Sequence, residues 1–284
     1  MFTLGFLIYT FNRIDDARIN MELVRNLWQQ SGLFKEIRIV HAFNGNKDWY
    51  PKEYLEDDLV RIANPGHFQG AAELIDAGAA IFQEKYPNLD YIIVVAADSW
   101  LLKPDYVAKL LDRMSNDKRY IATCAWGNPN SNEVFDHGVA VDFFIYDPSW
   151  AVKYELFPVD YKSFANKYLD LILYRSGSHI LLEKLMVARF AKAVFREDNN
   201  DLKLKTNVMN RLLRLEDREP VHDTRNEQGE YSNRKPYWEH MGLVTHHDPA
   251  PKREILKMFG NTQGDNISRL LNSPDLTYYN NGAR

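Results

Sequence analysis

Asp98 follows the most hydrophobic run of the chain, in the sequence VVAADSW. A carboxylate at the end of a buried strand lies at the mouth of a sheet, where it can bind a metal ion or a ribose hydroxyl. A purely structural role is the alternative, because an aspartate also accepts backbone N–H bonds in a tight turn. The neighbouring residues favour the functional interpretation.

Three of the eight histidines lie close together in WEHMGLVTHHD, as His240, His246 and His247. Neutral imidazole is a common metal ligand, but histidines are as often simply hydrogen-bonded in place. The segment lacks the H-E-x-x-H spacing, which argues against a dedicated zinc site. A metal-dependent phosphoesterase using His246, His247 and Asp248 would need more acidic strand ends than the chain offers.

Three further carboxylates are candidates for acid–base chemistry: Asp136, Asp142 and Glu183. Asp142 lies inside the apolar segment VAVDFFIY, which we expect to be a strand, and a carboxylate is costly there unless it is paired or functional. Glu183 lies in the first turns of the helix expected over SHILLEKLMVARFAKAVF. It is equally consistent with an ordinary solvent-facing helix residue, and the sequence does not choose between the three.

The elements that must position these residues alternate along the first part of the chain. Buried strands are predicted at 4–9, 36–42, 91–96 and 120–125, with helices after Asp15-Asp16 as N-cap, over 71–86 and from Pro104. The stretch between the second strand and Gly70 reads as irregular. This alternation predicts an α/β fold with a mostly parallel sheet between helices, and ligands of such sheets bind outside the carboxyl ends of the strands. Those ends carry Thr10, Asn12 and Arg13, then Asn44 and Gly45, then Asp98 and Ser99.

Composition narrows the class of protein. The 284 residues are 45% hydrophobic and 26% charged, as in an ordinary globular protein, and a net charge of −4 gives no reason to expect nucleic-acid binding. The single cysteine, Cys124, excludes an internal disulfide framework. The N-terminal segment lacks a basic region and a cleavage site, and no apolar run is long enough to span a membrane. We therefore expect a cytoplasmic protein, with peripheral membrane association left open and no prediction of oligomeric state.

The segment DYIIVVAADSWLLKP resembles the central strand of nucleotide-sugar glycosyltransferases of the GT-A fold, with a family-2-like pattern. In that family the strand ends in an Asp-x-Asp motif that holds Mn²⁺ or Mg²⁺ on the donor diphosphate. Here Ala96 replaces the first aspartate and only Asp98 remains, so the motif is degenerate. The resemblance also covers YTFNR and the segment ANPGHFQGAAELIDAG.

The resemblance implies a Rossmann-like, mostly parallel sheet and a single domain, with residues 1–125 binding the nucleotide-sugar and a more helical half, 126–284, binding the acceptor. It implies that the nucleotide-sugar is bound by a set of residues near the strand ends: Thr10, Asn12, Arg13, Asn44, His67, Gln69, Gly70, Asp98 and Ser99. A divalent cation would be held by Asp98 with His246 or His247. An inverting enzyme would take its base from Glu183, Asp142 or Asp136, whereas a retaining enzyme often has no clear base.

The expected function is therefore transfer of a sugar from a UDP- or GDP-linked donor to a glycan, a lipid-linked glycan or another hydroxyl acceptor, in polysaccharide biosynthesis. The lost aspartate motivates the alternative, a non-catalytic protein that binds a nucleotide-sugar or glycan.

Overall fold

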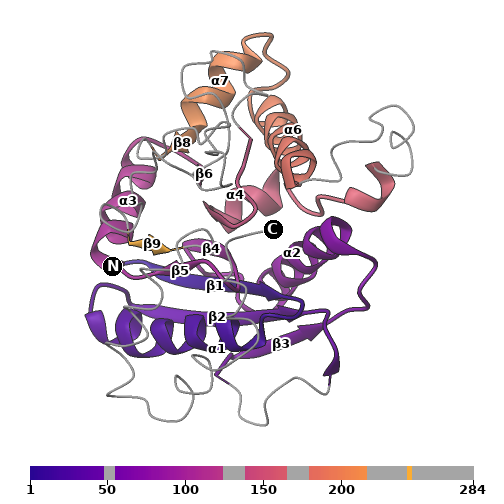
Figure 1. Cartoon of the computed structure of the whole chain (residues 1–284). Coiled ribbons are helices and arrows are strands. Elements are labelled where there is room, and N and C mark those ends of the chain that lie inside the picture. The colour runs from indigo at the N-terminus through magenta and orange to yellow at the C-terminus, as the bar shows by residue number, and fades with distance from the viewer. Residues whose placement is uncertain (48–54, 124–137, 165–178, 216–241, 245–284) are drawn as a thin grey trace, which may run out of the picture.

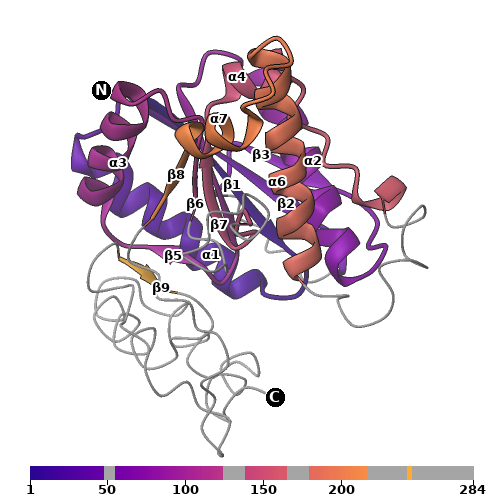
Figure 2. The same cartoon turned by 90° about the horizontal axis from the view of Figure 1, so that it is seen from above.

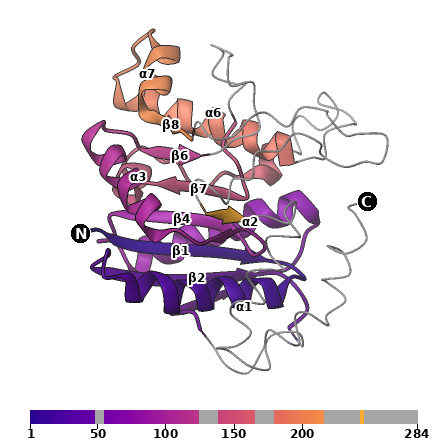
Figure 3. The same ribbon diagram turned by 60° about the vertical axis from the view of Figure 1, so that its left-hand side comes forward.

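The computed structural model describes residues 1–47, 55–123, 138–164, 179–215 and 242–244. Its centre is a seven-stranded sheet in the order β3-β2-β1-β4-β7-β6-β8 (Figure 3). The strands are β1 (Thr3–Thr10), β2 (Glu36–Phe43), β3 (Asp58–Arg61), β4 (Tyr91–Ala96), β6 (Ile121–Thr123), β7 (Phe143–Tyr146) and β8 (Leu212–Arg214). All neighbours are parallel except β7, which is antiparallel to both β4 and β6.

Helices cover both faces of this sheet (Figure 1, Figure 2). The helices are α1 (Ile14–Leu23), α2 (His67–Lys85), α3 (Pro104–Asn116), α4 (Pro148–Lys153), α6 (His179–Glu197) and α7 (Leu204–Arg211), and α1 continues into η1 (Val24–Trp28) and η2 (Gln29–Ser31). A second, two-stranded sheet pairs β5 (Trp100–Leu101) with β9 (Leu243–Val244). The predicted α/β class with a mostly parallel central sheet between helices is confirmed.

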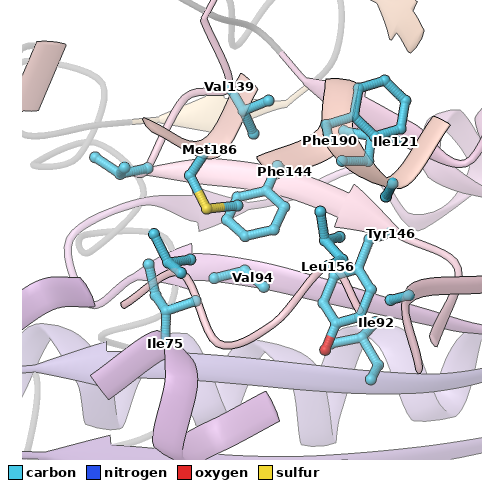
Figure 4. Close-up of a cluster of buried hydrophobic side chains, with 14 of the residues drawn as sticks. Ile75, Ile92, Val94, Ile121, Val139, Phe144, Tyr146, Leu156, Met186 and Phe190 are labelled. Atoms are coloured by element: carbon cyan, nitrogen blue, oxygen red, sulfur yellow. The ribbon is translucent and has the colours of Figure 1, made fainter. Parts of the chain in front are cut away.

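The alternation of side chains along each strand builds two hydrophobic cores. On one face, Phe6, Ile8 and Ile93 pack with Trp28 and Leu111 of the α1 and α3 side. On the other face, the cluster includes Ile75, Val94, Phe144, Met186 and Phe190 (Figure 4). Because both faces are covered, β1 and β4 read as continuous apolar runs in the sequence.

Several predicted boundaries need correction. Helix α1 begins one residue before Asp15, its N-cap is Arg13 without a side-chain cap bond, and Asp16 is buried within the helix, so Asp15-Asp16 is not the cap. Helix α2 begins at His67, which places Gly70 inside its first turn rather than before it. The stretch expected to be irregular contains β3, a short edge strand that pairs with β2.

The segment 139–146 is a strand only in its second half, since β7 begins at Phe143. Asp142 therefore precedes the strand instead of lying within it. Within the described ranges, no helix has the combination of length and apolar composition that crossing a bilayer requires.

Candidate active site

The chain changes direction across the sheet beside β1. From β1 it moves to β2 and β3 on one side, and from β3 it returns to β4 on the other side (Figure 1). A crevice forms at such a switch point outside the carboxyl ends of the strands, and ligands of α/β proteins bind there. The residues after β1 and β4 are thus the candidates on topological grounds, independently of any motif.

The turn after β4 is fixed on three sides. Ser99 N donates to Ala96 O at 2.9 Å, and Ala97 N donates to Tyr9 O at 3.1 Å on β1. From α1, the buried Asn20 donates its Nδ2 to Ser99 O at 2.9 Å. These bonds hold the backbone on both sides of Asp98, so the position of its carboxylate is set by the sheet and by α1 together.

Asp98 forms an ion pair with Arg13, the residue at the N-cap position of α1. Arg13 Nη1 lies 2.5 Å from Asp98 Oδ2, and the two side chains are 23% and 13% exposed. A charge-assisted bond at this distance, in a partly desolvated setting, orients both groups. The structure therefore joins the end of β1 to the end of β4 through the two charged residues that the sequence singled out.

The side chain of Tyr9, on β1, is influenced electrostatically by three carboxylates. Its hydroxyl donates to Val141 O at 2.9 Å. Burial, and then the negative charges of Asp142, Asp98 and Glu183 in that order, raise the pKa of Tyr9 well above its ordinary value. The hydroxyl thus stays protonated at neutral pH and lies within the field of three carboxylates that are far apart in the sequence.

Asp142 reaches this place by strand pairing. Ala96 N donates to Asp142 O at 3.1 Å, continuing the antiparallel β4–β7 ladder by one residue pair, and Ala96 is also the parallel partner of Tyr9. Tyr9, Ala96 and Asp142 therefore form one row across three strands. Directly paired residues point to the same face, so Asp142 stands beside Ala96 at the end of β4.

Glu183 lies in the second turn of α6 and is fully buried, at 0% exposure. Its backbone oxygen accepts a bond from Val139 N at 3.2 Å, which ties this turn of α6 to the segment leading into β7. The solvent-facing interpretation of Glu183 is therefore wrong. A buried carboxylate near a protonated tyrosine suits acid–base chemistry better than an exposed one.

The remaining predicted nucleotide-binding residues differ in how accessible they are. Thr10 is buried, and its hydroxyl lies 3.1 Å from Nε2 of His41. Burial, with a smaller contribution from Arg61, lowers the pKa of His41 to about 3, so the imidazole is neutral. Asn12, by contrast, is exposed just beyond β1. Thr10 and His41 are thus buried structural residues that connect the ends of β1 and β2.

Asn44, at the end of β2, is packed against the first turn of α2. A Cβ on Gly70 would lie 2.7 Å from Asn44 Nδ2, so a larger residue there would displace the Asn44 side chain. Among the described residues, Oδ1 of the buried Asn44 has no hydrogen-bond partner, and neither has Oγ of the buried Ser99. The site is therefore bordered by amide and hydroxyl groups.

Two residues at the start of α2 complete the predicted set. Gln69 donates its Nε2 to Glu73 Oε1 at 2.7 Å along the helix. His67 is the first residue of α2, and its side chain lies outside what the structure describes.

Asp136, His246 and His247 lie outside the described residues. In the described ranges, no group of three or more His, Cys, Asp and Glu side chains is placed to hold a metal ion. Strand β9 pairs with β5, with Val244 opposite Trp100. Val244 is two residues before His246 in the sequence, and Trp100 is two residues after Asp98.

Sequence reasoning missed Tyr9, His41 and Asn20. All three lie within segments whose pattern is that of a core strand or an amphipathic helix, and their roles depend on pairing register rather than on local sequence. His41 could have been noticed, because a polar residue near the end of an apolar strand is costly to bury unless it has a role.

Comparison with known proteins assigns the chain to no family. No family model and no curated protein matches the chain. A solved structure of the galactosyltransferase LgtC, in complex with donor and acceptor sugar analogues, matches with a TM-score of 0.41 and 10% identity over 64% of this chain and 70% of that one. At this score and identity, the likeness assigns neither activity nor ligand.

Proposed function

We propose that this chain is a glycosyltransferase that moves a sugar from a nucleoside-diphosphate sugar to a hydroxyl acceptor. One observation carries the proposal: Arg13 and Asp98 form an ion pair at the switch point of an α/β sheet, beside the row of Tyr9, Ala96 and Asp142. The resemblance of DYIIVVAADSWLLKP to the donor-binding strand of GT-A transferases points to the same edge of the sheet.

Inverting transfer of a glycosyl group needs a base for the acceptor hydroxyl, and either stereochemical outcome needs positive charge at the leaving diphosphate. Asp142 and Glu183 are the candidate bases that lie within the described site, whereas Asp136 lies outside the described residues. Arg13 is the cation beside Asp98, and Asn44 offers an amide oxygen for the donor's base or ribose.

A divalent cation on Asp98 does not fit the described donor set. Ala96 supplies no ligand, and Oδ2 of Asp98 already accepts a bond from Arg13. A site built from Asp98 with His246 or His247 stays a prediction, because both histidines lie outside the described residues.

The test is turnover of a panel of UDP- and GDP-sugars, measured as released nucleoside diphosphate with and without glycan acceptors. Glu183→Gln and Asp142→Asn each remove one candidate base at nearly constant volume. Loss of a general base lowers kcat by about 10²- to 10⁴-fold. Asp117→Asn, at an exposed aspartate after α3, is the matched control and keeps wild-type turnover.

The assay also separates the alternative function, a non-catalytic protein that binds a nucleotide-sugar or glycan. Saturable binding of a nucleotide-sugar without release of nucleoside diphosphate on any acceptor would establish it. Turnover unchanged in both Glu183→Gln and Asp142→Asn would instead remove these two residues from the catalytic role.

A further inference from the structure

We propose that the guanidinium of Arg13, held by Asp98, takes the place of a divalent cation at the donor's diphosphate, so that this chain binds nucleoside diphosphates without metal. The inference rests on the proposed function and names what stabilises the diphosphate in that same site. Three features of the described residues carry it.

The first feature is the ion pair itself. Arg13 Nη1 contacts Asp98 Oδ2 at 2.5 Å, at the switch point where a diphosphate would lie. The backbone of Arg13 is fixed as well, because its carbonyl accepts a bond from Ala17 N at 3.0 Å in the first turn of α1. A cation whose side chain and backbone are both positioned needs little reorganisation when a ligand arrives.

The second feature is the geometry of a guanidinium. It has five N–H donors in a planar fork, so the same group can contact a carboxylate and a phosphate oxygen at once. At 23% exposure, the Arg13 side chain is accessible to a ligand yet partly shielded from water, which strengthens charge-assisted bonds. Asp98 then acts as a positioning residue for the cation.

The third feature is the donor set around Asp98. Hard divalent cations require several oxygen ligands, and Ala96 has none to give. A cation on Asp98 would also stand beside the positive charge of Arg13, at a separation where like charges repel strongly. A guanidinium in place of the metal ion thus explains both why Ala96 can replace the first aspartate of the motif and why Arg13 is paired with Asp98, the second.

The local charge makes Arg13 necessary rather than incidental. Asp98 follows β4, and Asp142 lies opposite Ala96 at the end of the same strand, so this end of the sheet carries two carboxylates. Without Arg13, a diphosphate entering this edge would meet mainly negative charge. A purely structural ion pair between β1 and β4 is the competing explanation, and it predicts a change in stability without a change in nucleotide affinity.

Calorimetric titration of UDP and of GDP into the full-length protein tests the proposal. The wild type is titrated once in EDTA and once in MnCl₂, and we expect the same affinity in both. Arg13→Gln should weaken binding by about ten- to a hundredfold, the range for losing a hydrogen bond to a charged group. Arg13→Lys should fall between the two, since it keeps the charge and loses the fork.

Arg113→Gln is the matched control, because Arg113 is an exposed arginine at the end of α3 and its loss should leave binding unchanged. Thermal unfolding of each variant reports on the structural role separately.

Wild-type binding that disappears in EDTA and returns with Mn²⁺ overturns the inference and leaves the proposed function standing. Unchanged affinity in a folded Arg13→Gln variant overturns it as well, in favour of a structural pair. Absence of binding under both conditions contradicts the proposed function and this inference together. The wild-type comparison needs no variant, so the proposal stays decidable even if Arg13→Gln fails to fold.

Discussion

Asp76 links helix α2 to the segment that leads toward α6, and its ionisation should make stability depend on pH. Its Oδ1 accepts a bond from Val159 N at 2.6 Å and its Oδ2 one from Asp160 N at 3.1 Å. Burial, opposed by these two bonds and by the charge of Arg189, raises the pKa of Asp76 from 3.8 to about 6.

The sign and size follow from linkage. A carboxyl group whose pKa is higher in the folded than in the unfolded state binds its proton more tightly when folded. Its contribution to stability is therefore greatest below pH 3.8 and is lost as the pH rises to about 6. The interval between the two pKa values corresponds to about 3 kcal/mol of unfolding free energy.

Asp76→Asn removes the titration and keeps one acceptor oxygen for the two N–H groups. Urea unfolding of wild type and variant at pH 4, 5, 6 and 7 gives the free-energy difference between them at each pH. We expect this difference to shift in favour of the variant by about 2.4 kcal/mol from pH 4 to pH 7, mostly before pH 6, since the rest of the 3 kcal/mol falls below pH 4. Asp117→Asn, at an exposed position, should show no such trend. A difference that is flat with pH, or that shifts in favour of the wild type, would refute the reasoning.

Three further outcomes test the packing around the site. A Cβ on Gly78 would lie 2.1 Å from Leu7 Cδ1 in the core, so Gly78→Ala should lower the urea unfolding free energy by about 1–3 kcal/mol despite the better helix propensity of alanine; a stabilised variant would contradict this packing. Tyr9→Phe leaves Val141 O without its donor and should cost about 1–2 kcal/mol in the same measurement, an effect that a solvent-facing hydroxyl would not produce. The buried His41, with a pKa of about 3, should keep constant imidazole NMR shifts from pH 8 to pH 5, and a transition near pH 6.5 would show it to be solvated.

The parallel half of the sheet is mostly predictable from the sequence, because its strands are marked by the composition of their own residues. Strands β1 and β4 are buried on both faces and read as unbroken apolar runs. Strand β3, with the sequence DLVR at the edge, carries no such run, and β8 is three residues that form a strand only by pairing with β6. Strands such as β3 and β8, which form only by pairing with a neighbouring strand, therefore lack a recognisable pattern in their own sequence.

The candidate site shows the same division. Arg13 and Asp98 could be named from strand ends, because polar groups after buried strands indicate a sheet's mouth. Their mutual contact, and the row formed by Tyr9, Ala96 and Asp142, follow from register and from the antiparallel insertion of β7, which no local pattern encodes. The burial of Glu183 likewise depends on the segment before β7 lying against α6.

The place of β7 in the sheet has a consequence for how the chain is made. Strand β4 lies between β1 and β7, yet β7 emerges from the ribosome only after β5, α3 and β6. Until then the sequence YIIVVA presents one open hydrogen-bonding edge, and such an edge on an apolar strand promotes association between chains. Expression fragments that stop before Phe143 should therefore aggregate, whereas fragments that include β7 have that edge covered.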